Sequence, residues 1–271
     1  MATVTYQGSG DGQVSVGRVI SRAFGFIASS PAIALGSALL FGALPSILSQ
    51  VLMTTSFRGV AASNASSPLF SGLMFLGFLS FVVAMVFSGL MQATITRGLV
   101  IEHEGGRPSF GQCLAGGMRY ALPIVGLIIL WSIAVGFGFM LLMIPGLILI
   151  TMWSVAVPAL VEENTGVFGA FSRSRELTRG ARWKIFGLLI MLLIIYYLIS
   201  MVLGLVGLAS VSRTSLMLDP AAGLPIGLLV GSAISGAIFT LLWATIQPSL
   251  FVELRDAREG GGAGDLQQVF A

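Results

Sequence analysis

The sequence predicts an all-α membrane protein with six transmembrane helices, and three observations lead to this fold class. Segment 120–161 contains 42 consecutive residues without Lys, Arg, His, Asp or Glu. One bilayer crossing needs about 20 apolar residues, so this segment predicts two crossings folded back on each other. Hydrophobic residues make up 56% of the chain and charged residues 9%, against about 25% charged in an average soluble domain. The charged residues also fall between apolar segments of crossing length.

Six apolar segments have the length of a tilted crossing. They are 32–55, 69–96, 120–143, 145–161, 185–211 and 224–252. We expect a turn at Pro145 and Gly146, between the third and fourth segments, because proline cannot continue a helix and glycine tolerates a turn. The membrane domain then covers 16–258, and flexible ends cover 1–15 and 259–271, where polar residues and glycine are frequent.

The predicted loops differ in their content of basic residues, and this difference sets the orientation. Twelve of the 14 Lys and Arg residues lie on one side of the predicted bundle, and only Arg58 and Arg213 lie on the other. Cytoplasmic loops carry the excess of Lys and Arg, so we expect both termini in the cytoplasm, as an even number of crossings requires. No cleavable signal peptide is expected, because the first apolar segment is too long for a signal core.

A weak repeat divides the chain into three units. Segments that begin at Val16 and Phe110 carry apolar or small residues at i, i+3, i+4, i+7 and i+8, which is the stripe of an amphipathic helix, and a poorer stripe follows Phe168. We therefore predict three transmembrane hairpins, each preceded by a cytoplasmic amphipathic helix at the membrane interface. Each even-numbered apolar segment also leads into an apolar residue followed by a glutamate, and these glutamates are Glu102, Glu162 and Glu253.

Small residues recur every four positions at the start of the sixth segment. On a helix they lie along one ridge, and small residues let the backbones of membrane helices approach each other. We predict that this ridge packs against a neighbouring helix and that leucine at its glycine positions destabilises the protein. The residues are Gly223, Gly227, Gly231 and Ser235.

A cluster of cations follows the fourth apolar segment. Beside a bilayer such a cluster attracts anionic lipid head groups, at about 1 kcal/mol per basic residue. The same residues would also set the topology without binding a ligand, and the sequence leaves both interpretations open. The cluster contains five cations within twelve residues: Arg173, Arg175, Arg179, Arg182 and Lys184.

The sequence predicts no catalytic, metal or cofactor site. The single histidine, His103, lies between two glutamates, but three consecutive side chains of a helix cannot converge on one ion. The single cysteine, Cys113, lies on an apolar stripe, where it is expected to pack, and one cysteine forms no intramolecular disulfide. The net charge of +3 is too small to predict a nucleic-acid partner.

The apolar segments themselves hold few polar groups. None of them contains an ionisable residue, which argues against a proton- or sodium-driven carrier and against an intramembrane enzyme. Gln92 and Gln247 lie near the ends of the second and sixth segments. We expect them to form hydrogen bonds between helices rather than a substrate site.

Part of the chain resembles a known bacterial family. Residues 140–190 are similar to the membrane domain of bacterial glycerophosphoryl diester phosphodiesterases and to the related YciC-like integral membrane proteins. Some relatives carry a soluble phosphodiesterase barrel beside this domain, but this chain has no room for one, so the diesterase activity is not expected here. The resemblance implies a bacterial inner-membrane protein. It is carried by Pro145-Gly146-Leu147-Ile148-Leu149, Trp153, Pro158-Ala159-Leu160-Val161-Glu162, Gly169-Ala170-Phe171, Arg173-Ser174, Glu176-Leu177-Thr178-Arg179-Gly180 and Trp183.

The sequence therefore favours an integral inner-membrane protein that acts as a scaffold or accessory factor linked to lipid or to the cell envelope. The expected partner is the phospholipid bilayer with its anionic lipids, and neither enzymatic activity nor a cofactor is expected. The alternative is a passive or exchange-type transporter or channel for a small or lipidic solute, with a cavity between the three units.

Overall fold

The computed structural model describes residues 14–43, 45, 47, 68–209 and 226–259, and every regular element among them is helical. The expected flexible ends, 1–15 and 259–271, and the second half of the first apolar segment lie largely outside the described residues. The elements are α1 (Val16–Ser29), α2 (Pro31–Ser37), the π-helix η1 (Ala38–Ala43), α4 (Pro68–His103), α5 (Phe110–Met118), α6 (Ala121–Leu141), α7 (Met143–Met152), α8 (Ala156–Glu163), α9 (Gly166–Thr178), α10 (Arg182–Ala209) and α12 (Ile226–Glu259).

Several helices are long and apolar enough to cross a membrane. Within the described ranges there are five such helices, and α1 with the segment after it, bent by 95° at their junction, would make a sixth if the pair counts as one. The prediction of an all-helical chain with several membrane-length helices is confirmed, and the pairing into three hairpins stays a prediction. The five are Ser71–His103, Ala121–Leu141, Met143–Glu163, Arg182–Gly207 and Val230–Arg258.

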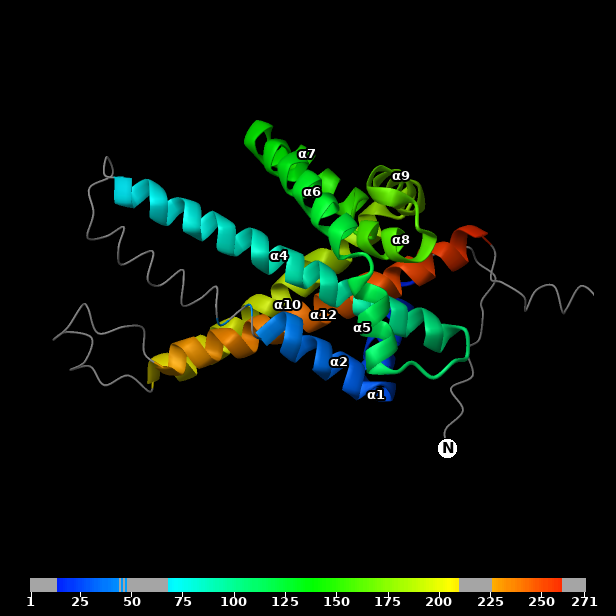
Figure 1. Ribbon diagram of the computed structural model, residues 1–271, viewed down its shortest axis with the longest axis horizontal. Helices are drawn as coiled ribbons and strands as arrows, with labels where there is room; N and C mark the ends of the chain where they lie inside the picture. Colours follow the sequence, from blue (N-terminus) through cyan, green and yellow to red (C-terminus); the bar gives the residue numbers. More distant parts are fainter. Residues whose placement is uncertain (1–13, 44, 46, 48–67, 210–225, 260–271) are drawn as a thin grey trace, which may run out of the picture.

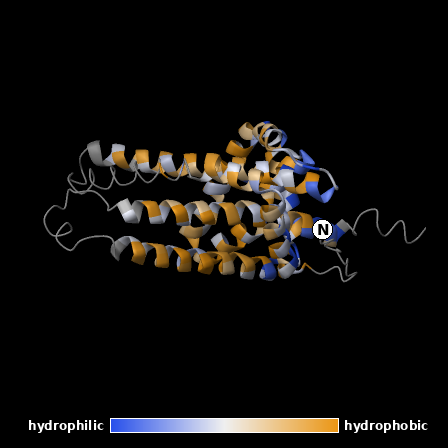
Figure 2. Ribbon diagram, turned by 90° about the horizontal axis from the view of Figure 1, so that it is seen from below, coloured by the Kyte–Doolittle hydropathy of each residue, from blue (hydrophilic) through white to orange (hydrophobic). Residues whose placement is uncertain are grey.

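The helices form a bundle with one polar end. In Figure 1, α10 and α12 run side by side, α4 crosses the middle of the molecule, and α6 and α7 form a separate arm. Figure 2 shows hydrophilic residues gathered at the end from which the N-terminal segment leaves, and apolar residues along the remaining length. We call this the polar end; it comprises α1, α5, α8, α9, the last turns of α4 and α12 and the first turn of α10.

The last third of α4 is the centre of the packing, and glycines permit it. A Cβ atom on Gly98 would lie 2.8 Å from the ring of Phe26 in α1, and one on Gly89 would lie 2.7 Å from Ile128 in α6. Helix α5 packs against the backbone of α4 itself, because a Cβ on its Gly117 would lie 2.9 Å from a backbone nitrogen of α4. Glycine therefore stands at these three contacts, where a larger side chain would keep α1, α5 or α6 away from α4.

Helices occupy the three segments predicted to be amphipathic. They are α1, α5 and α9, and each buries one face: Cys113 and Gly117 are buried in α5, for example. One residue of the predicted α1 stripe is misplaced, since Phe24 is exposed and Phe26 is buried instead. The physical reason is the contact with α4, where Gly98 leaves room for the Phe26 ring.

The turn between α6 and α7 lies at Leu142, three residues before the predicted position. Leu142 has an extended backbone, with φ −162° and ψ 147°. Pro145 lies in the first turn of α7, where its missing N–H leaves no helical hydrogen bond unmade. Gly146 faces α6 instead, because a Cβ there would lie 2.7 Å from the ring of Phe139. The prediction of a turn at Pro145 and Gly146 was wrong, and the glycine allows close packing of the hairpin.

The fourth predicted crossing lies within Met143–Glu163, a span long and apolar enough to cross a membrane but not one continuous helix. It is divided into α7 and α8 by a break at 153–155, where Trp153 has φ −106° and ψ 18° and Val155 has φ −112° and ψ 21°. Pro158 explains the break, because it has no N–H to bond the carbonyl oxygen of Ser154, four residues earlier.

The ridge of small residues in α12 lies partly against α10. A Cβ on Gly231 would lie 3.1 Å from the carbonyl oxygen of Leu203 in α10. Ser235, one turn further, is buried, and Gly227 is half-buried. Gly223 lies outside the described residues. The contact at Gly231 is the one on which the packing hypothesis now rests.

Leucine at Gly231 is expected to destabilise the protein in detergent by about 2 kcal/mol, because its side chain would meet the α10 backbone and force the helices apart. Gly187→Leu in α10 is the matched control, since a Cβ at Gly187 meets nothing within 4 Å. Thermal unfolding of the two variants gives the comparison. Equal melting temperatures would mean that this face of α12 does not pack against α10.

Candidate functional site

The three glutamates noted in the sequence lie at the polar end, and each contacts a helix other than its own. Glu102 accepts a hydrogen bond from the Ser29 hydroxyl of α1 at 2.7 Å. Glu162 lies 3.5 Å from the guanidinium of Arg97 in α4. The repeat in the sequence indicated these glutamates as a set, but their partners are 73 and 65 positions away and local spacing does not reveal them.

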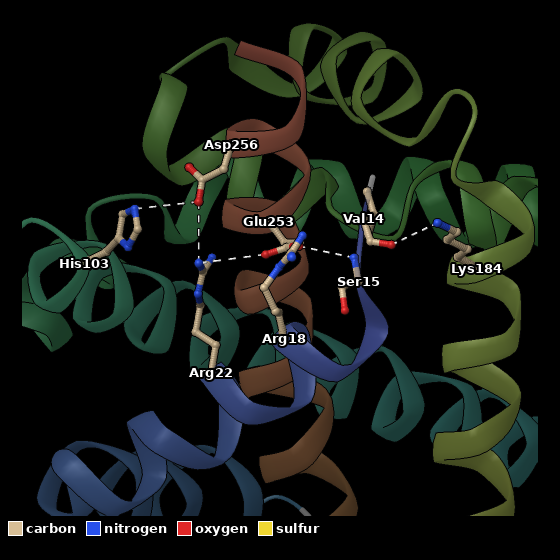
Figure 3. A network of polar contacts seen from close by, with 8 residues as sticks. All are labelled: Val14, Ser15, Arg18, Arg22, His103, Lys184, Glu253 and Asp256. Atoms are coloured by element: carbon tan, nitrogen blue, oxygen red, sulfur yellow. Dashed lines mark hydrogen bonds and ion pairs between the residues drawn. The ribbon is translucent and has the colours of Figure 1, made fainter. Parts of the chain in front are cut away.

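Glu253 of α12 is the third glutamate, and its side chain is only 4% exposed. Its Oε1 accepts hydrogen bonds from Arg18 Nε at 2.7 Å and from the backbone N–H of Ser15 at 3.2 Å. Its Oε2 lies 3.9 Å from Nη2 of Arg22, as Figure 3 shows. A carboxylate removed from water needs such partners, so these contacts fix the start of α1 to α12.

Asp256, one turn further along α12, extends this network. Its Oδ2 lies 3.5 Å from Arg22 Nη2 and 3.8 Å from His103 Nε2 (Figure 3). His103 is the last residue of α4, and its ring faces this carboxylate. Lys184 at the start of α10 donates to the carbonyl oxygen of Val14 at 3.1 Å. Helix α1 and the residues before it are therefore held by α4, α10 and α12 together.

Arg97 joins α4, α6 and α8 on the other side of the polar end. It donates to the carbonyl oxygen of Val161 at 2.9 Å and to the hydroxyl of Tyr120 at 3.2 Å. Its guanidinium also lies 5.6 Å from the centre of the Tyr120 ring, within the range of a cation–π contact. Among the described residues, Arg97 Nε and Glu162 Oε1 are buried without a hydrogen-bond partner.

Two glutamines, from α4 and α12, lie beside the break between α7 and α8. The side-chain amides of Gln92 in α4 and Gln247 in α12 meet between the helices at 2.6 Å, and they bond when the oxygen of one faces the nitrogen of the other. The Gln247 amide also faces the carbonyl oxygen of Ser154 and the indole nitrogen of Trp243.

The neighbours of Gln247 decide how its amide is turned. A carbonyl oxygen only accepts and an indole N–H only donates. The nitrogen of Gln247 therefore points to Ser154, and its oxygen accepts from Trp243 at 3.1 Å. In the opposite orientation Gln92 Nε2 would donate to Gln247 Oε1, but Ser154 and Trp243 would both face like groups. The carbonyl that Pro158 leaves open is thus bonded by α12.

The second open carbonyl of the break is bonded by α9. The carbonyl oxygen of Met152 accepts from the hydroxyl of Ser174 at 2.9 Å, and the hydroxyl of Thr178 lies 3.2 Å from it and 2.8 Å from the carbonyl oxygen of Ser174. Both hydroxyls belong to the buried face of α9. The interrupted helix therefore holds α9 against the bundle, which is a connection that the poorer stripe after Phe168 did not predict.

The structure divides the five predicted lipid-binding cations. Arg173 is engaged with carboxylates, because its Nε lies 2.7 Å from Glu163 and its Nη1 lies 3.6 Å from Glu176. Lys184 bonds the backbone before α1. These two cations therefore contact groups of the protein itself, and whether the cluster binds lipid or only sets the topology stays a prediction.

The remaining three cations lie around the turn between α9 and α10. Arg175 and Arg179 are exposed, and neither forms an ion pair within the described ranges. Arg182 is half-buried. The guanidinium of Arg258 in α12 donates to the backbone carbonyl of Arg179, which brings to this turn a cation that the sequence did not place there. Gly180 permits the turn with φ +88°.

No metal cluster is present in the part of the chain that the structure describes, where three His, Cys, Asp or Glu side chains never group together. Cys113 is fully buried in the apolar core, and burial raises the pKa of its thiol. A thiol in these surroundings packs as a small apolar side chain. The side chains described above thus bond one another at the polar end, and the turn between α9 and α10 is exposed and basic.

No protein-family model, no curated protein and no solved structure matches the chain.

Proposed function

We propose that the protein is an integral membrane scaffold or accessory factor of the bacterial inner membrane, with both termini and the polar end in the cytoplasm. The observation that carries this proposal is the use of the ionisable side chains. Glu253, Glu162 and Arg173 bond to groups on neighbouring helices or at helix ends. Such pairing serves a defined shape, whereas a catalytic site requires groups that converge on one reacting position.

We also propose that the bundle consists of three hairpins with an interfacial helix before each. Support comes from the helices α1, α5 and α9, which begin close to the predicted repeat positions. The close approach of α6 and α7 supports the second hairpin, since a Cβ on Gly138 would lie 3.0 Å from the backbone of Gly146. The contact between Gly231 and Leu203 supports the third in the same way.

A passive or exchange-type transporter for a small or lipidic solute is the second candidate function. The break between α7 and α8 favours it, because transporters form substrate sites at interrupted transmembrane helices. We rank this function lower because the two open carbonyls of the break, at Met152 and Ser154, are already bonded by Ser174, Thr178 and Gln247.

Two measurements on the full chain separate the two functions. In proteoliposomes loaded with a mixture of small solutes, a scaffold is expected to release no solute faster than empty liposomes do. After extraction in native lipid, a scaffold is expected to carry one protein or lipid class at near-stoichiometric amount, enriched over the surrounding membrane. Selective solute release, abolished by Gln247→Leu, would contradict the scaffold and establish the transporter.

A further inference from the structure

Helix α9 has two chemically different faces. Its buried face contains Ala170, Ser174, Leu177 and Thr178, and it is attached to the bundle through the carbonyl of Met152. Its outward face carries Phe168, Arg175 and Arg179. These residues are at i, i+7 and i+11, so they lie on one side of the helix. The outward face thus presents one aromatic side chain and two cations.

Two large aromatic side chains flank these cations. Phe168, at the start of α9, is 78% exposed, and Trp183, at the start of α10, is 85% exposed. Aromatic side chains are enriched at the level where lipid head groups meet the hydrocarbon. Trp183 lies in the first turn of α10, where the apolar course of that helix begins, and Phe168 lies in the first turn of α9, which belongs to the polar end. With α10 crossing the membrane, the surface between them would lie at head-group depth.

The charge of this surface is positive. Arg175 and Arg179 are exposed and form no ion pair within the described ranges. The one carboxylate of α9, Glu176, faces Arg173 at 3.6 Å. Arg258 adds a third cation through its bond to the Arg179 carbonyl. Guanidinium groups bind phosphate oxygens by paired, charge-assisted hydrogen bonds.

We propose that the outward face of α9 and the start of α10 form a binding surface for the head groups of anionic phospholipids. We name it the α9 surface: Phe168, Arg175, Arg179, Trp183 and Arg258. Its cations would bind the phosphate, and its aromatic side chains would lie against the upper acyl chains. The proposal names the partner of the scaffold proposed above, and it rests on that function only in placing the polar end at the membrane surface.

The test measures lipid affinity of the full chain in neutral detergent by native mass spectrometry, with phosphatidylglycerol and phosphatidylcholine of identical acyl chains as probes. In the variant R175Q/R179Q the affinity for phosphatidylglycerol is expected to fall by about 20- to 30-fold, since each cation contributes about fivefold. The affinity of this variant for phosphatidylcholine is expected to stay within about twofold of the wild-type value, because the choline cation balances the phosphate and that lipid has no net charge.

The matched control is R107Q/R119Q, which removes two exposed cations of the polar end outside the α9 surface. Its affinity for phosphatidylglycerol is expected to change less than about threefold, because screening limits charges beyond the immediate site. An equal loss in both variants would overturn the proposal in favour of non-specific attraction. An unchanged affinity for phosphatidylglycerol in R175Q/R179Q would also overturn it, and would favour an acidic segment of a protein partner as the ligand of this face.

A second measurement needs no variant. Raising the salt concentration from about 50 mM to about 500 mM should weaken phosphatidylglycerol binding by the wild-type protein at least tenfold, because it screens exposed charges. A salt-independent affinity would contradict binding through Arg175 and Arg179. Failure of these lipid tests leaves the solute-release and native-lipid results untouched, so the α9 surface and the scaffold function can fail separately.

Discussion

Replacing Glu253 with alanine is expected to destabilise the folded protein in detergent by about 3 kcal/mol, because it leaves buried charge without a partner. Arg22, whose side chain is 10% exposed, would lose one of its two carboxylate neighbours, and the N–H of Ser15 would lose its acceptor. Arg18 is 39% exposed, so water can replace part of its bond to Glu253. The expected loss of stability therefore lies at the lower end of the range for breaking a buried ion pair. Thermal or denaturant unfolding followed by circular dichroism gives the measurement.

Asp256→Asn provides the control for Glu253→Ala. Asp256 is on the same helix, but it is 32% exposed and its contacts with Arg22 and His103 are longer, at 3.5 and 3.8 Å. Its replacement should cost less than about 1 kcal/mol, as for exposed ion pairs. If both variants unfold like the wild-type protein, the network around Glu253 does not hold α1 on the bundle.

Leucine at Gly117 is expected to be at least as damaging, with a loss of about 3 kcal/mol from overpacking. A Cβ at this position would lie 2.9 Å from the backbone nitrogen and 3.2 Å from the Cα of Thr94. Because backbone atoms cannot turn aside as a flexible side chain can, α5 would have to leave α4. Cys113 on the same helix would then become accessible, so the rate of its alkylation reports the separation directly.

Gly111→Leu is the control in the same helix. A Cβ at Gly111 meets nothing within 4 Å, so this leucine should leave stability nearly unchanged, and its better helix propensity offsets part of any cost. Slow alkylation of Cys113 in both variants, with unchanged melting temperatures, would show that α5 does not depend on this contact.

The sequence predicted the membrane-length helices because a run without charges is a property of composition alone. Segment 120–161 is the clearest case, and α6 and α7–α8 occupy it. The helices α1, α5 and α9 were predicted from the period of apolar residues. At the start of α5 a cap reinforces the pattern, because the hydroxyl of Ser109 accepts a bond from the N–H of Gln112.

The contacts of the polar end were not predictable in the same way. The pairs Glu253 with Arg18 and Gln92 with Gln247 are 235 and 155 positions apart, and one sequence does not show which groups meet. The break at 153–155 had a local signal in Pro158, but only the structure shows that side chains of α9 and α12 bond the two open carbonyls. Proline alone does not predict such a break, since Pro248 lies inside the continuous helix α12.

The prediction for the arginine cluster was incomplete for a similar reason. Charge density along the chain grouped Arg173 with Arg175, but Arg173 turns toward Glu163 and Arg175 remains exposed. Arg258 reaches the same turn from the far end of the chain. A run of cations in sequence thus gives the sign of a surface, and the fold selects which of them face outward.

The central claim is that the polar end lies in the cytoplasm with the apolar helices crossing the membrane. Reporter fusions along the chain test it most directly, with one reporter active inside the cell and one active outside. Fusions after Arg107, Gly180 and Glu259 should report the cytoplasm, and fusions at Ser63 and Ala221, positions outside the described residues, should report the external side. An external result after Gly180, in the turn that carries the α9 surface, would contradict the account.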